Sequence, residues 1–283
     1  MIKATIIQDS VYLNRITTFE LEYPRFIHAE LMTHRQFSRN AASSRAIPIE
    51  RMHEHIRDNP AMPIHWGRNQ PGMQADEQIS DIRSARNNWL TASDMAVHSA
   101  RMLMMDGLHK QIANRVTEPF QTMKTVVTAT EYDNFFELRC HRDAQPEIRE
   151  LALQMQDALA NYNPLQLRVG DWHVPYVDRD NSQFEVRYSV DGQPVTLKEA
   201  KEISASCCAQ VSYRRNDTSA EKASLIYKRL IESKPAHLSP VEHQATPIPD
   251  NDTMYLGITH TDRHGQRWSG NFKGWIQLRQ YIV

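Results

Sequence analysis

The sequence predicts an α/β fold of the α+β type, in which a mixed or antiparallel sheet packs against several long helices. Residues 2–7 and 16–22 are rich in β-branched side chains and lie close together, which indicates two neighbouring strands. Residues 76–107 instead repeat apolar side chains every three or four positions, as a long amphipathic helix does. A chain that mixes both periods is expected to fold as a sheet covered by helices.

The first half of the chain continues with shorter elements. Pro24 suits the first turn of a helix over roughly residues 24–35, and Pro48 opens a second, short helix. Between these helices, residues 32–45 form a polar loop. Residues 57–75 contain three prolines and two glycines and are expected to be irregular.

The second half alternates the same two kinds of element. The clearest predicted strand is residues 122–130, and the Asp191-Gly192 pair predicts a β-hairpin turn within residues 173–195. Helices are expected over residues 132–141, 146–160, 196–212 and 218–233.

Composition is that of an ordinary globular chain and excludes several classes of function. The 283 residues are 40% apolar and 24% charged with a net charge of −1, so a basic surface that tracks nucleic acid is not expected. No apolar run is long enough for a membrane helix, and the N-terminus predicts a strand rather than a signal peptide. Three cysteines without a CxxC pair favour a reducing, cytoplasmic location.

The segment Met32–Arg45, MTHRQFSRNAASSR, concentrates hydrogen-bond donors in fourteen residues. Arginine forks pair bidentately with phosphate, and serine hydroxyls can complete the shell, so the segment predicts an anion site. The chain has no GxGxxG or GxxxxGK[ST] loop, which means that a bound phosphate would be held by side chains. The alternative is a solvated surface loop.

Two further arginines are ambiguous from the pattern alone. Arg139 lies at the end of an apolar stripe in the segment NFFELRCHRDAQPE and could donate to a flat heterocycle or form a surface salt bridge. Arg115 is of the same kind. The pair His53-x-His55 lacks the carboxylate support of a metal site, so we expect no metal and solvated histidines there.

The segment HRQFSRNAASSR resembles the signature RHRxxSxNxxSxR of the flavin-dependent thymidylate synthases. His34, Arg35, Ser38, Asn40, Ser43 and Arg45 match it, and Thr33 replaces the leading arginine. Residues 24–35 resemble the helix that leads into the signature. Arg115–Pro119, the strand 122–130 and LRCHRDAQPEIR are similar to the family's arginine, strand and helix segment.

A fourth match is out of place. Residues 207–243 look like the helices and the SPFEH motif that the family carries before its signature, but here SPVEH follows the signature by almost 200 residues. The resemblance therefore implies a permuted segment order. It also implies one flavin-dependent thymidylate synthase-like domain over residues 1–283, with insertions near 57–75 and 161–195 and a C-terminal extension at 245–283.

The resemblance implies a homotetramer with shared active sites that methylates C5 of a pyrimidine nucleoside monophosphate, usually dUMP to dTMP. Methylenetetrahydrofolate would supply the carbon, and FAD reduced by NADPH would supply the hydride. By the family's pattern, Ser43, Ser44 and Arg45 hold the phosphate with Arg115, while Glu30, Ala41 and the catalytic Arg139 lie at the base. The implied flavin contacts are Thr33, His34, Arg35, Asn40, Asn134, Ser239, Glu242 and His243.

The departures from the family's pattern leave the substrate open. Ala41 replaces a glutamate and Glu30 replaces a glutamine, both near the substrate. Because a carboxylate can accept from the 4-amino group of cytosine, the alternative is the same flavin and folate chemistry, methylation or hydroxymethylation, on dCMP or another pyrimidine nucleotide. An alternative of a different class is a non-catalytic nucleotide-binding module.

Overall fold

The protein is described by a computed structural model that covers residues 2–43, 47–180, 186–211, 219–249 and 257–282. The strands of the main sheet are β1 (Lys3–Val11), β2 (Arg15–Pro24), β3 (Ser38–Ala41), β4 (Thr122–Ala129) and β5 (Leu165–Gln166). The α-helices are α1 (His28–Met32), α2 (Ile49–Asp58), α3 (Ile82–Met105), α4 (Lys110–Ala113), α5 (Asp133–Arg139), α6 (Pro146–Ala160), α7 (Leu197–Ala209) and α8 (Ala220–Glu232).

Short strands and 3₁₀ turns complete the chain. The short strands are β6 (Asp178–Asp180), β7 (Arg187–Val190), β8 (Gln193–Val195), β9 (Ala245–Pro247), β10 (His260–Thr261), β11 (Arg267–Ser269), β12 (Phe272–Lys273) and β13 (Trp275–Gln277). The 3₁₀ turns are η1 (Arg25–Ile27), η2 (Asn114–Phe120), η3 (Ser239–Glu242) and η4 (Leu278–Tyr281).

The main sheet has the order β3-β4-β2-β1-β5. β1 and β2 form the predicted hairpin, and β2 pairs antiparallel with the whole length of β4. β3 adds antiparallel to the outer edge of β4, whereas β5 runs parallel to β1. The expectation of a mixed sheet with several helices is confirmed.

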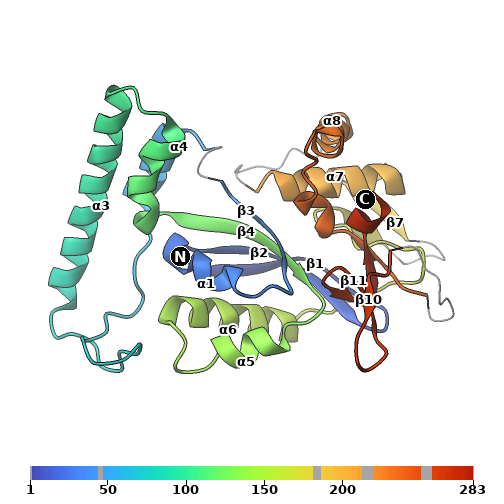
Figure 1. Ribbon diagram of the computed structural model, residues 1–283, viewed down its shortest axis with the longest axis horizontal. Helices are drawn as coiled ribbons and strands as arrows, with labels where there is room; N and C mark the ends of the chain where they lie inside the picture. Colours follow the sequence, from blue (N-terminus) through green and yellow to red (C-terminus); the bar gives the residue numbers. More distant parts are fainter. Residues whose placement is uncertain (1, 44–46, 181–185, 212–218, 250–256, 283) are drawn as a thin grey trace.

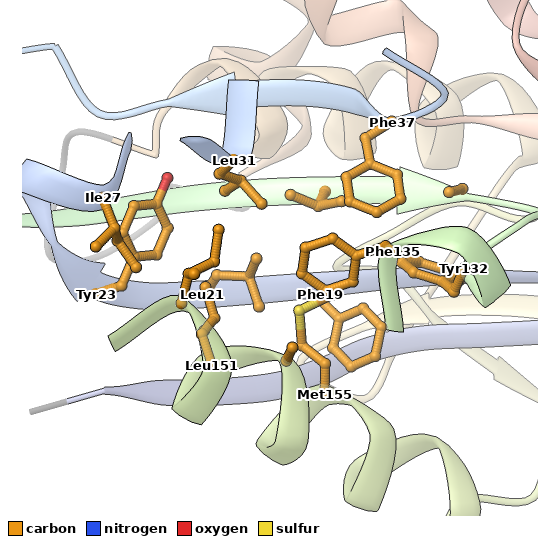
Figure 2. Close-up of a cluster of buried hydrophobic side chains, with 14 of the residues drawn as sticks. Phe19, Leu21, Tyr23, Ile27, Leu31, Phe37, Tyr132, Phe135, Leu151 and Met155 are labelled. Atoms are coloured by element: carbon orange, nitrogen blue, oxygen red, sulfur yellow. The ribbon is translucent and has the colours of Figure 1, made fainter. Parts of the chain in front are cut away.

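Helices cover both faces of this sheet (Figure 1). α5 and α6 lie on one face, where the fully buried Phe19 and Leu21 of β2 meet Leu151 and Met155 of α6 (Figure 2). α7 lies on the other face, where its Cys208 packs against Val126 of β4. Successive strand residues point to opposite faces, so the face toward α6 is apolar and the other is mixed. That second face carries the buried Thr18 and Thr128 and the partly exposed ion pair of Glu20 with Lys124.

The long helix α3 stands at the end of the molecule away from α7 and α8 (Figure 1). It packs against η2 and α2, with Trp89 edge-on to Phe120. Asp81 caps it by accepting from the Ser84 amide at 2.9 Å, so the helix begins six residues later than predicted. No helix in the described part of the chain is both long and apolar enough to cross a membrane.

Two local predictions are wrong in their extent. The helix expected over 24–35 is the short pair η1 and α1, because β2 continues to Pro24 through its pairing with Thr122 of β4. The loop expected over 32–45 contains β3, whose polar residues are held as a strand by the β4 ladder. The predicted hairpin turn is confirmed: Asp191 and Gly192 have φ of 49° and 75° between β7 and β8.

Candidate functional site

β3 places the signature at the edge of the main sheet. Ser38 and Asn40 lie opposite Thr128 and Val126 of β4. Arg39, between them, donates from Nη1 to the carbonyl oxygens of Met32 and His34 at 2.8 and 3.1 Å. This partly buried guanidinium closes the turn that follows α1 and so fixes the backbone of the signature histidine.

Arg139 joins the end of α5 to this turn. Its Nε donates to His34 Nε2 at 2.9 Å, and its Nη1 donates to Glu30 Oε2 at 3.2 Å. A longer bond of 3.4 Å reaches from Nη2 to Thr33 Oγ1. The structure therefore unites Arg139 and Glu30, expected at the substrate, with Thr33 and His34, expected at the flavin. A planar guanidinium can hold three such acceptors at once.

His34 is neutral in this cluster. Burial, together with the Arg139 and Arg39 charges, lowers the pKa of His34 to about 4. Its Nε2 must then offer a lone pair to Arg139, which places the ring proton on Nδ1. The ring lies edge-on to Phe135 at 4.8 Å between centroids, so apolar packing helps to exclude water from it.

The other residues expected at the flavin fall into two groups. Arg35 and Asn134 are exposed, and in the described part of the chain the Arg35 side chain has no ion-pair partner. Asn40 is partly buried: its Nδ2 donates to the Cys208 carbonyl at 3.1 Å, but its Oδ1 has no hydrogen-bond partner there. A free guanidinium and an unsatisfied amide oxygen fit a diphosphate-bearing cofactor with polar ring edges.

The permuted order implies that SPVEH still packs beside the signature, and the structure confirms this, because η3 contacts β3. The Glu242 carboxylate acts on Arg39, raising the pKa of a guanidinium that burial lowers. Arg279 forms an ion pair with the same carboxylate. Ser239 is exposed, whereas His243 is completely buried.

His243 ends a buried chain of hydrogen bonds across the sheet. Its Nδ1 lies 2.8 Å from Thr128 Oγ1, which lies 2.7 Å from Thr18 Oγ1. Thr18 Oγ1 contacts His173 Nε2 at 2.8 Å, and His173 Nδ1 contacts Ser10 Oγ at 2.7 Å. Burial lowers the pKa of His243 to about 3, so the ring is neutral and serves to join η3 to the sheet.

The described residues include only two of the four expected at the phosphate, Ser43 and Arg115. Ser44 and Arg45 lie outside the described residues, and Ser43 is the exposed residue just before them. Ala41 is exposed at the end of β3. Arg115 pairs with Glu118 at 3.1 Å, and Arg25 pairs with the same carboxylate oxygen at 2.7 Å.

The sequence did not indicate the contacts that residues 271–277 make with the signature. Gln277 Nε2 donates to Ser38 Oγ at 3.1 Å and to the Glu242 carbonyl at 3.2 Å. Asn271 Nδ2 donates to the Gln36 carbonyl at 2.8 Å. These amides belong to no motif, so only the fold reveals that this segment supports the signature. Arg39 was also missed, although its place inside the signature is a usable signal.

The expectation of solvated histidines in α2 is wrong. His53 is 2% exposed, and His55 Nε2 lies 2.6 Å from Thr122 Oγ1. The amphipathic helix α2 turns both histidine side chains toward other parts of the same protein rather than toward water. Within the described ranges, no group of three histidine, cysteine or acidic side chains could hold a metal ion.

Comparison with known proteins adds a family to this geometry. A family model described as thymidylate synthase complementing protein matches residues 10–165, which include the signature and Arg139. Two solved structures of the UMP/dUMP methylase PolB from Streptomyces cacaoi, bound with 5-Br dUMP and 5-Br UMP, are similar to the chain. Their sequences are 21% and 22% identical to this chain, and their TM-scores are 0.44 and 0.43. Each match covers 54% of this chain, and the matches cover 67% and 70% of the two PolB chains. No curated protein matches.

Proposed function

The chain belongs to the thymidylate synthase complementing protein family and is a thymidylate synthase-like enzyme, and on this premise we propose that it methylates C5 of a pyrimidine deoxynucleotide. The proposed reaction converts dUMP to dTMP, with methylenetetrahydrofolate as the carbon donor and NADPH as the reductant. The observation that carries the proposal is the meeting of Arg139 with Glu30 and His34, because it joins the residues expected at the substrate to those expected at the cofactor.

Arg139 is the proposed catalytic residue. Its side chain is 21% exposed, so it is accessible while much of its charge is shielded from water. A guanidinium in this setting can donate to a pyrimidine carbonyl and stabilise negative charge that develops on the ring. Glu30 and the neutral His34 orient it from two sides, which reduces the reorganisation needed when substrate binds.

FAD is the proposed cofactor and would supply the reducing equivalents for the methyl group. We assign its contacts to Thr33, His34, Arg35, Asn40, Asn134, Ser239 and Glu242, with Arg35 as the cation for its diphosphate. The completely buried His243, also expected at the flavin, instead holds η3 against the sheet through Thr128. The phosphate of the nucleotide is assigned to Ser43, Ser44, Arg45 and Arg115. A homotetramer in which different subunits complete each site would bring these dispersed residues together, with α3 as part of the scaffold.

The raised pKa values of two cysteine thiols are consistent with a reaction that uses no cysteine nucleophile. Burial raises the pKa of the Cys140 thiol, and burial raises that of Cys208 well above its ordinary value. A thiolate at neutral pH is disfavoured at both positions. Catalysis would then depend on positioning and on charge stabilisation by Arg139.

The second candidate is the same chemistry, methylation or hydroxymethylation, on dCMP or another pyrimidine nucleotide. Glu30 is the observation that favours it, because a partly exposed carboxylate at the base can accept from the 4-amino group of cytosine. Arg139 does not discriminate, since O2 is an acceptor in both bases.

The test is to incubate the protein with dUMP, dCMP or UMP, methylenetetrahydrofolate and NADPH, and to identify products by mass spectrometry. We expect a methylated dUMP, and a preference for dCMP would establish the second candidate. Glu30→Gln should shift the preference between the bases, whereas Glu137→Gln, on the exposed face of α5, should not. Tight nucleotide binding without any product would instead support a non-catalytic module.

A further inference from the structure

A pocket of about 320 Å³ is lined by residues that do not belong to the site described above. Its walls come from residues 169–172, from α7, from β9 and from η4, and include Trp172, Lys201, Thr246, Leu278 and Tyr281. All of these residues follow the 10–165 segment that matches the family. The volume is at the lower end of the range for small-molecule sites and fits a ligand with a single ring.

Lys201 gives the pocket an uncompensated positive charge. Its ammonium lies 4.2 Å from the centroid of the Trp172 ring. Apart from this contact, the Lys201 ammonium has neither a carboxylate partner nor a hydrogen bond within the described ranges. Burial lowers the pKa of Lys201, and no acidic neighbour opposes the shift. A partly buried cation without a counter-ion is costly, and an anion in the pocket would offset that cost.

Thr246 adds an independent sign of a missing polar partner. The residue is 5% exposed and lines the pocket, and in the described part of the chain its Oγ1 has no hydrogen-bond partner. Buried hydroxyls are nearly always satisfied, so this oxygen needs a group that the chain does not provide. The nearby rings of Trp172 and Tyr281, 5.8 Å apart and inclined by 51°, offer flat apolar surface.

We propose that this pocket binds a small organic anion, a carboxylate or phosphate ester carried on a flat ring. Lys201 pairs with the anionic group, Thr246 contributes its hydroxyl, and Trp172 and Tyr281 contact the ring. Leu278 directly follows Gln277, whose amide donates to Ser38 of β3. The pocket is thus built onto the segment that supports the signature.

The proposal is tested by measuring the binding of benzoate, phenyl phosphate and benzamide to the full chain by calorimetry or ligand-observed NMR. We expect benzoate or phenyl phosphate to bind at least about tenfold more tightly than uncharged benzamide, because benzamide cannot form the charge-assisted contact with Lys201. Binding of either anion supports the site, and the tighter binder shows whether the site prefers a carboxylate or a phosphate ester. Failure of both anions, or equal binding of benzamide, overturns it.

Variants locate the binding. Lys201→Met keeps the length of the side chain over Trp172 and should weaken the anion at least about tenfold. Lys198→Met, on the same helix, removes an exposed ammonium that is not part of the pocket and should leave binding unchanged. Thr246→Val should weaken binding by a smaller factor and provides a second arm if Lys201→Met does not fold. Equal effects of the two lysine variants would overturn the proposal.

Discussion

Replacing Arg139 with lysine isolates the role of the planar guanidinium. The substitution keeps a positive charge that can still pair with Glu30. It removes the forked geometry that reaches His34 at 2.9 Å and Thr33 at 3.4 Å at the same time. If Arg139 contacts the pyrimidine ring through this fork, charge alone cannot replace it.

The structure sets the expected loss of stability. The bond to Thr33 is long and contributes little, so the main loss is the bond to His34, worth about 1 kcal/mol net. This corresponds to a fall in Tm of about 2–4 °C for a chain of this size. Turnover should fall by about a hundredfold or more, the effect of losing one preorganised donor to developing charge.

The assay measures turnover, bound flavin and Tm of Arg139→Lys beside Arg142→Lys. Arg142 is 86% exposed and pairs with Asp143, so its replacement should leave all three values unchanged. We expect Arg139→Lys to retain flavin while its turnover collapses. Wild-type turnover in Arg139→Lys would refute the assignment, since Arg139 would then act only as a structural cation.

Three further predictions concern the cofactor, the phosphate and pH. Arg35→Ala should fold normally but purify without colour, as absorbance will show; a fully coloured variant would remove Arg35 from the flavin site. Arg45→Ala should weaken nucleotide binding about ten- to a hundred-fold, and Ser43→Ala less; equal binding of nucleoside and nucleotide by the wild type would contradict a phosphate site. The His34 ring should titrate near its pKa of about 4 rather than 6.5 when followed by NMR. Because the unfolded chain takes up this proton first, the His34 contribution to stability is present above pH 6.5 and is lost as the pH falls toward 4.

The sequence predicts the elements whose pattern is local. α6 begins at Pro146 and ends at Ala160 as expected, because Pro146 stands at its first turn and Gln145 caps it. The β1–β2 hairpin and β4 are likewise found where alternating β-branched residues indicate them. The packing of η3 against β3 is not local, but the displaced SPVEH motif implies it, and loop closure over a long separation costs little additional free energy.

The sequence does not predict features that depend on distant partners. β3 is polar and has no strand signal of its own, so only its pairing with β4 makes it a strand. His34 and Arg139 are 105 residues apart, and their hydrogen bond exists because α5 ends above the turn after α1. Gln277 carries no motif, and its role in supporting Ser38 follows from the position of β13.

The most direct measurement is a single turnover. Protein with reduced flavin is mixed, without oxygen, with methylenetetrahydrofolate and a pyrimidine deoxynucleotide, while flavin absorbance and nucleotide product are followed together. We expect oxidised flavin to return in step with one C5-methylated nucleotide per flavin, and Arg139→Lys to slow both signals by about a hundredfold or more. Flavin that stays reduced with every pyrimidine nucleotide, or product that forms without flavin oxidation, would contradict it.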